Sequence, residues 1–115
     1  PTIVLKQGKP ILALGAAGGT RILTSVAHII LGYLEFHQDL YTALAMPRFH
    51  HQWKPDQILV DSGLTPSLDV RALRKMGYTV TEKLPTVNRV QAVASDADGL
   101  LGVADPRDAG TSAAE

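Results

Sequence analysis

A run of small residues, Gly15-Ala16-Ala17-Gly18-Gly19-Thr20, constrains the fold of this chain more than any other feature. The preceding residues 11–14 are apolar at every position, which is typical of a strand buried on both faces. In the following residues 22–34, apolar side chains recur at helical spacing, and Thr20 is the predicted N-cap. The chain must therefore pass from a buried strand into a buried helix through glycines, which adopt backbone angles that other residues avoid.

The rest of the sequence predicts an α+β fold with a mainly antiparallel sheet, because hairpin turns occur near both ends of the chain. These turns lie at residues 7–10 and 96–99. Asp39 is the predicted N-cap of a second helix, Thr65 that of a third, and Gly77 ends the third helix. Residues 48–56 are predicted to be irregular. We predict strands at residues 2–5, 11–14, 57–61, 78–82, 89–94 and 100–104, and helices at 20–36, 39–46 and 65–76.

Composition excludes several classes of function. The 11 basic and 11 acidic residues cancel, so nothing indicates binding to nucleic acid or to an anionic membrane surface. The longest apolar run, residues 26–34, is interrupted by His28 and Gly32 and is too short to span a bilayer. The chain has no cysteine, which excludes disulfides and thiol nucleophiles.

The glycine turn is the main candidate for chemistry. A strand that ends in glycines and opens a helix exposes backbone N–H groups at a positive helix terminus, which stabilises a phosphate or the oxyanion of an acyl-transfer intermediate. The alternative is a tight turn whose small residues only permit close packing. No Lys-Ser/Thr pair follows the glycines, so the turn does not match a phosphate-binding P-loop.

The remaining polar candidates favour structural roles. His50 and His51 are adjacent, and adjacent side chains in an extended segment point in opposite directions, so we predict neither a metal site nor a cofactor. Arg48 and Arg107 each follow a proline and are predicted to form buried ion pairs with carboxylates, the alternative being surface positions. Trp53 is predicted to anchor its loop by packing.

Pro1 could act as a general base if it were a free N-terminal amine, as in the tautomerase superfamily. That superfamily shows a repeated β-α-β unit, whereas a β-hairpin is predicted to follow Pro1 here and no second copy is visible. The sequence therefore disfavours this interpretation.

Four segments, in this order along the chain, resemble gamma-glutamyltranspeptidases. Pro1-Thr2-Ile3-Val4 is similar to the family's S-P-T-I strand, and residues 15–22 are similar to its G-[SA]-[PA]-G-G-[ST]-x-I turn. Pro47-Arg48-Phe49-His50-His51-Gln52-Trp53 is similar to its P-R-F-H-x-Q-W segment, which is the most specific of the four. Asp105-Pro106-Arg107 resembles its D-P-R. The resemblance covers residues 1–108, which we take as the C-terminal part of a small subunit, with residues 109–115 as a frayed tail.

The resemblance implies an N-terminal-nucleophile hydrolase fold with stacked α, β, β and α layers. A precursor in that family cleaves itself and exposes a threonine, which attacks the gamma-glutamyl amide of glutathione or a related compound. Water, an amino acid or a dipeptide then accepts the gamma-glutamyl group. The resemblance also implies that the main-chain N–H groups of Gly18 and Gly19 form the oxyanion hole.

One departure from the family pattern limits what this chain does by itself. The catalytic threonine and most residues that hold the glutamyl group precede Pro1 in the family's order, so we expect the isolated chain to be inactive. Its expected partners are the rest of the small subunit and the large subunit. We also expect self-association through sheet edges and apolar faces left open in the isolated chain. Family members are usually periplasmic or secreted.

Two further functional interpretations stay open at this point. A cephalosporin acylase or a poly-gamma-glutamate-processing relative would share the fold and the glycine pair but differ in its substrate pocket. A binding module without catalytic activity would use the glycine turn only to hold an anion.

Overall fold

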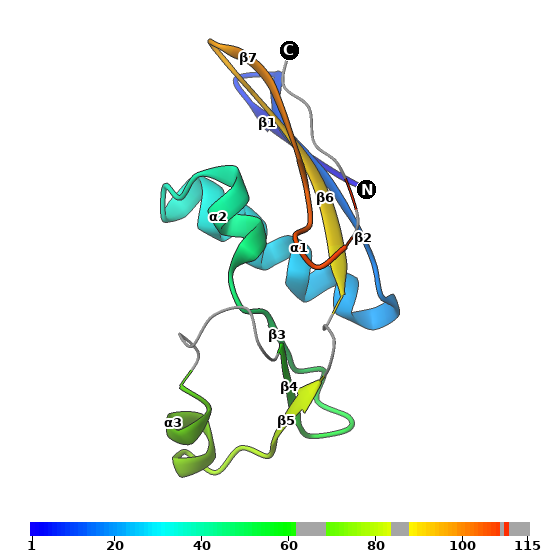
Figure 1. The fold of residues 1–115 in the computed structure, drawn as a ribbon, viewed down its shortest axis with the longest axis vertical. Coiled ribbons are helices and arrows are strands. Elements are labelled where there is room, and N and C mark those ends of the chain that lie inside the picture. The colour runs from blue at the N-terminus through cyan, green and yellow to red at the C-terminus, as the bar shows by residue number, and fades with distance from the viewer. Residues whose placement is uncertain (62–68, 84–87, 109, 111–115) are drawn as a thin grey trace.

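The computed structural model describes residues 1–61, 69–83, 88–108 and 110, and its largest element is a twisted four-stranded sheet. Its strands are β1 (Thr2–Lys6), β2 (Lys9–Ala17), β6 (Arg89–Asp96) and β7 (Gly99–Ala104), in the order β1-β2-β6-β7. All neighbouring strands in this sheet run antiparallel. Hairpins join β1 to β2 and β6 to β7, so both predicted hairpins are confirmed (Figure 1).

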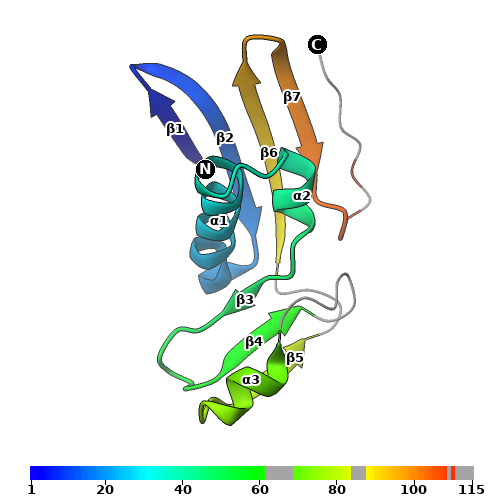
Figure 2. The same cartoon turned by 90° about the vertical axis from the view of Figure 1, so that its left-hand side faces the viewer.

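One face of this sheet is covered by two helices (Figure 2). Helix α1 (Ile22–Ile30) continues through a π-helical segment (Leu31–Glu35), and helix α2 (Leu40–Ala45) folds back beside it. Alternating residues of the strands point toward the helices and form the main core. That core consists of Leu12, Leu14, Val26, Ile29, Leu40, Ala43, Leu44, Val90, Ala92, Ala94 and Val103.

A second, smaller sheet lies beyond the lower end of the first one in Figure 1. It contains β3 (Phe49–His50), β4 (Ile58–Asp61) and β5 (Val80–Lys83), in the order β3-β4-β5. Helix α3 (Val70–Lys75) precedes β5 and packs against a small core of Ile58, Val60 and Val80. Strands β4 and β5 are parallel, which is the one exception to antiparallel pairing among the described strands.

Most local predictions are confirmed. The side chain of Asp39 accepts a hydrogen bond from the Thr42 N–H at 2.9 Å and caps α2. Gly77 follows α3 with a positive φ of 97°. The segment at residues 48–56 is less irregular than predicted, because the two residues of β3 pair with β4.

Two predictions about helix starts have different outcomes. Thr20 is not an N-cap, because a 3-10 turn (Gly19–Arg21) precedes α1 and places Arg21 at the cap position without a side-chain cap bond. Thr65 and the tail at 109 and 111–115 lie outside the described residues. The described part of the third helix begins after Asp69, whose carboxylate accepts from the Ala72 N–H at 2.9 Å.

No helix in the described ranges is long and apolar enough to cross a membrane.

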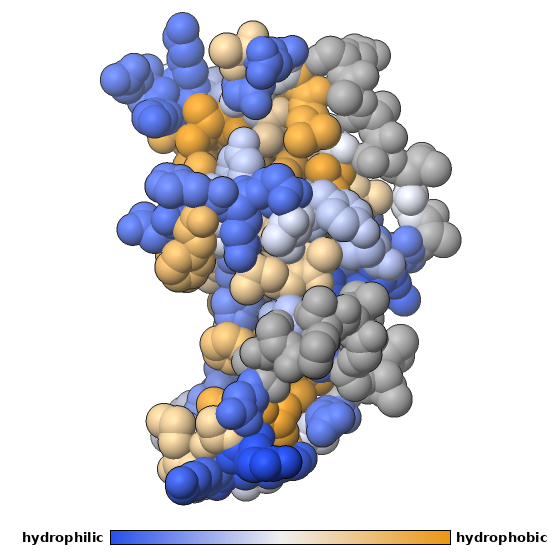
Figure 3. All heavy atoms as spheres, turned by 60° about the vertical axis from the view of Figure 1, so that its left-hand side comes forward, coloured by the Kyte–Doolittle hydropathy of each residue, from blue (hydrophilic) through white to orange (hydrophobic). Residues whose placement is uncertain are grey.

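Among the described residues, most of the sheet face opposite the helices is uncovered, and it is largely apolar. Ile3, Ala13, Val93 and Gly102 stand side by side across its four strands, as the strand registers show. Ile3 is 64% exposed and Val93 is 43% exposed. A shallow hollow of about 450 Å³ lies over this row. Figure 3 views the molecule mainly from the side that carries the helices, where apolar side chains lie in the upper part and at the lower end, among hydrophilic ones.

We predict that the isolated chain self-associates through this open face, because an exposed apolar face of a sheet favours contact with another copy. Light scattering after size-exclusion chromatography is expected to give a mass above 12.3 kDa. The double variant Ile3→Lys and Val93→Lys is expected to shift the mass toward the monomer. A monomeric unaltered chain at high concentration would contradict the prediction.

Candidate functional site

The glycine turn joins β2 to α1 and has the unusual backbone that its sequence requires. Gly18 has a φ of 146° and Gly19 a φ of 65°, both in the region that favours glycine. The backbone then enters the 3-10 turn and α1 without a break. The N-terminal N–H groups of such a helix have no partner within the helix and carry partial positive charge. The turn therefore presents hydrogen-bond donors at the end of a strand.

A cavity of about 280 Å³ opens beside this turn. One wall is the turn itself, at residues 18–21, and the other comes from the segment that contains β3 and leads into β4. This second wall consists of His50, Gln52, Pro55, Gln57 and Leu59. The fold thus brings the two segments most typical of the resemblance, residues 15–22 and 47–53, to the same cavity.

A chain of side-chain hydrogen bonds joins the two walls. The hydroxyl of Thr20 donates to Gln52 Oε1 at 2.7 Å, and His50 Nε2 lies 2.9 Å from the same oxygen. Because a carboxamide oxygen only accepts, His50 carries a proton on Nε2. Its Nδ1 lies 2.9 Å from the hydroxyl of Thr24 on α1. These hydrogen bonds hold the β3 segment against the first turn of α1.

The other histidines do not converge on a common ligand position. His51 Nε2 lies 2.9 Å from Asp56 Oδ1. His28 stacks against Phe49 at 4.4 Å between ring centroids. Burial and then the charge of Arg48 lower the pKa of His28, partly offset by Asp61. Among the described residues no group of three or more His, Asp or Glu side chains could hold a metal ion.

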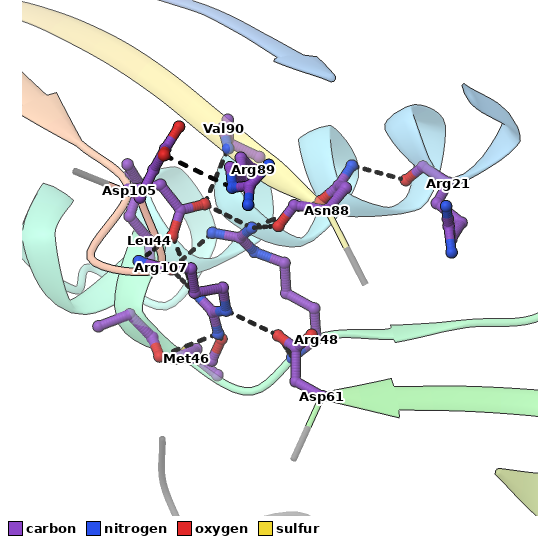
Figure 4. Close-up of polar contacts among 12 residues, drawn as sticks. Arg21, Leu44, Met46, Arg48, Asp61, Asn88, Arg89, Val90, Asp105 and Arg107 are labelled. Carbon is purple, nitrogen blue, oxygen red and sulfur yellow. Dashed lines mark hydrogen bonds and ion pairs between the residues drawn. The ribbon is translucent and has the colours of Figure 1, made fainter. Parts of the chain in front are cut away.

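A buried ion-pair network lies next to the site, where the two sheets meet (Figure 4). Arg48 Nη1 is 2.7 Å from Asp105 Oδ2, and both side chains are at most 1% exposed. Arg107 pairs with the other oxygen of Asp105 at 3.2 Å and with Asp61 at 2.9 Å. Both arginines also donate to the Leu44 carbonyl in the last turn of α2, at 2.6 and 2.8 Å. The structure thus places Arg48 and Arg107 in buried ion pairs with carboxylates.

The ionisation of Asp105 is controlled by its partners. Burial raises the pKa of this carboxyl, but the Arg48 guanidinium and the N–H groups of Arg107 and Val90 outweigh burial and hold the pKa below its ordinary value. Burial, together with the charge of Arg107, lowers the pKa of Arg48, while Asp105 opposes that shift. The pair is therefore charged at neutral pH.

Trp53 does not anchor its loop by packing, so that prediction is wrong. Its side chain is 73% exposed, and its backbone has a positive φ of 70°. The described contact of the ring is with Lys54, whose Nζ lies 4.5 Å from the ring centroid. The loop is held instead by Gln52, which donates to the Lys54 carbonyl at 2.9 Å.

Sequence reasoning missed Asn88 and Asp61 as members of this region. Asn88 precedes β6, is 4% exposed, and donates to the Arg21 carbonyl at 3.2 Å. Neither residue belongs to a recognisable motif, and the contacts Asn88–Arg21 and Asp61–Arg107 join residues that are 67 and 46 positions apart. No local pattern could have revealed them.

Comparison with known proteins places this geometry in a structural class. The solved W525D mutant of gamma-glutamyltranspeptidase from Pseudomonas nitroreducens superposes with a TM-score of 0.87 at 34% identity, covering 96% of this chain and 58% of that one. A cephalosporin acylase from Bacillus halodurans superposes with a TM-score of 0.82, over 96% of this chain and 21% of that one, but its 22% identity indicates a shared fold alone. The chain therefore forms part of an N-terminal-nucleophile hydrolase fold, as predicted.

The family follows from the sequence comparisons. The family model for gamma-glutamyltranspeptidase matches residues 1–115. The glutathione hydrolase proenzyme of Escherichia coli strain K12 is 37% identical over 108 residues, which are 93% of this chain. This chain belongs to the gamma-glutamyltranspeptidase family. It spans 18% of the length of that Escherichia coli relative.

We predict that Asp105→Asn destabilises the chain by about 3–5 kcal/mol, because it leaves two buried guanidinium groups without their shared carboxylate. Urea unfolding followed by circular dichroism measures the change. The matched control is Glu82→Gln, whose half-exposed ion pair with Arg74 is 3.9 Å long and is expected to contribute less than about 1 kcal/mol. Equal effects of the two substitutions would contradict the prediction.

We also predict that alanine is tolerated far less at Gly18 than at Gly19. A Cβ on Gly18 would lie 2.4 Å from the Cβ of Asn88, whereas no atom of the described residues lies within 4 Å of a Cβ on Gly19. Gly19→Ala is expected to cost only the left-handed backbone strain, roughly 1 kcal/mol. Gly18→Ala adds the steric clash. Thermal unfolding of the two variants tests this order, and a lower midpoint for Gly19→Ala would contradict it.

Proposed function

We propose that this chain supplies the oxyanion hole of an enzyme that transfers or hydrolyses the gamma-glutamyl group of glutathione and related amides. The main-chain N–H groups of Gly18 and Gly19 are the proposed donors. The observation that carries the proposal is the pair of positive-φ glycines at a strand-to-helix junction, on the wall of a cavity of about 280 Å³. Membership of the gamma-glutamyltranspeptidase family supports it.

In the proposed reaction the attacking hydroxyl belongs to a threonine outside this chain. Its oxygen adds to the gamma-glutamyl carbonyl carbon, and the carbonyl oxygen becomes an oxyanion. The two glycine N–H groups stabilise this charge as it develops, while the amine leaves with a proton and an acyl-enzyme ester forms. Water or an amino-acid or dipeptide acceptor then releases the glutamyl group through a second oxyanion at the same position.

The proposal has consequences for partners and location. The nucleophile and most of the glutamyl pocket would come from the rest of a small subunit and from a large subunit, so the isolated chain is expected to release no product from a gamma-glutamyl anilide. The whole protein is proposed to arise by self-cleavage of a precursor and to work in the periplasm or outside the cell.

The main experiment uses a chimera in which this chain replaces the matched segment of the Escherichia coli glutathione hydrolase proenzyme. In the chimera Gly19 is replaced by glycolic acid, which substitutes an ester oxygen for the backbone N–H and changes no side chain. Loss of one oxyanion donor is expected to lower kcat about 100- to 1000-fold in gamma-glutamyl anilide release, with little change in KM.

The matched control places glycolic acid at Gly8, an exposed hairpin glycine with a φ of 78° and nothing within 4 Å of its Cβ position. This change is expected to leave kcat within about twofold, because surface changes away from the site have small effects. Equal kcat values for the two esters would overturn the proposal. A chimera that cleaves itself normally but releases no anilide would favour the alternative of a binding module without catalytic activity.

A further inference from the structure

Asn88 occupies a distinctive position beside the glycine turn. The last pair of the ladder between β2 and β6 is Ala17 with Arg89, so Asn88 and Gly18 are the next residues beyond it, on opposite strands. The Cβ of Asn88 fills the space that a side chain on Gly18 would need, at 2.4 Å from an ideal Cβ. Asn88 is only 4% exposed. Its side chain therefore forms one wall against which the turn is packed.

The polar groups of Asn88 bond to Arg21 in the glycine turn and to Arg48 in the buried ion pair. Its side-chain Nδ2 donates to the Arg21 carbonyl at 3.2 Å, at the end of the turn. Its backbone carbonyl accepts from Arg48 Nη1 at 3.0 Å, and the same nitrogen is held by Asp105 at 2.7 Å. Figure 4 shows Asn88 between Arg48 and Arg21. The buried ion pair is thus connected to the glycine turn through one residue.

The turn needs such support because its glycines have wide conformational freedom. Within the turn, Arg21 Nε donates to the Gly18 carbonyl at 3.1 Å. No described atom lies within 4 Å of a Cβ position on Gly19, so no described side chain fills that side of the residue. The contacts of Asn88 with Gly18 and Arg21 hold the two ends of the turn, and so limit the angles that Gly19 can adopt between them.

We infer that Asn88 is a positioning residue that sets the direction of the Gly18 and Gly19 N–H groups and links them to the Arg48–Asp105 pair. The inference deepens the proposed function and rests on it. A displacement of about 1 Å of a catalytic group lowers the rate by up to about 100-fold. Loss of the Asn88 amide is therefore expected to lower kcat about 10- to 100-fold, while KM stays within about threefold.

Two substitutions in the same chimera test this inference. Asn88→Ala removes the amide. Asn88→Leu retains a side chain of similar size with its Cβ against Gly18, but it removes the donor to the Arg21 carbonyl. Both variants are expected to show the loss in kcat, and Asn88→Leu is expected to show it with a smaller fall in the unfolding midpoint than Asn88→Ala.

The control is Asp69→Ala, which removes the side-chain cap of α3, outside the buried ion-pair network. It is expected to lower the unfolding midpoint and leave kcat within about twofold. An equal loss of kcat in Asp69→Ala would mean that destabilisation alone explains the effect, and would overturn the inference. Unchanged kcat in Asn88→Leu would overturn it as well.

The ester at Gly19 distinguishes failure of this inference from failure of the proposed function. If the ester lowers kcat but the Asn88 variants do not, the result supports the Gly19 N–H as an oxyanion donor and shows that Asn88 does not position it. If the ester has no effect, the proposed function fails whatever the Asn88 variants show.

Discussion

The structure depends on the neutralisation of two buried arginines at the end of one helix. Arg48 and Arg107 both donate to the Leu44 carbonyl at the C-terminal end of α2, where the helix dipole favours positive charge. Two guanidinium groups so close together repel each other in a medium of low dielectric constant. Asp105 offsets this repulsion by offering one carboxylate oxygen to each of them.

The position of this cluster explains how the two sheets are joined. Asp105 follows the last strand of the larger sheet, Asp61 ends β4 of the smaller sheet, and Arg48 leads into β3. Because Asp105 pairs with Arg48 and Asp61 pairs with Arg107, each from another segment, the cluster ties these segments together. The glycine turn lies one residue from the cluster, through Asn88, so the accuracy of the candidate site depends on a polar core rather than on apolar packing alone.

Predictions from sequence succeeded where the physical cause was local. The cap at Asp39, the stop at Gly77 and both hairpins depend on residues within a few positions of one another, and the structure has all of them. Thr20 failed as a cap because two positive-φ glycines lead into a 3-10 turn, which moves the helix start beyond it. Trp53 failed as an anchor because its side chain is 73% exposed and contacts Lys54 of the same loop.

The sequence by itself favoured the backbone of the glycine turn, since glycine adopts those angles with less strain than other residues, and its motifs determined the family. The tertiary structure alone decided what surrounds that turn. Gln52 bonds to Thr20 across 32 residues of sequence, and His50 bonds to Thr24 across 26. Asn88 bonds to Arg21 across 67 residues. Such contacts depend on strand register and on the buried charges that orient the two sheets, and neither leaves a local pattern in the sequence.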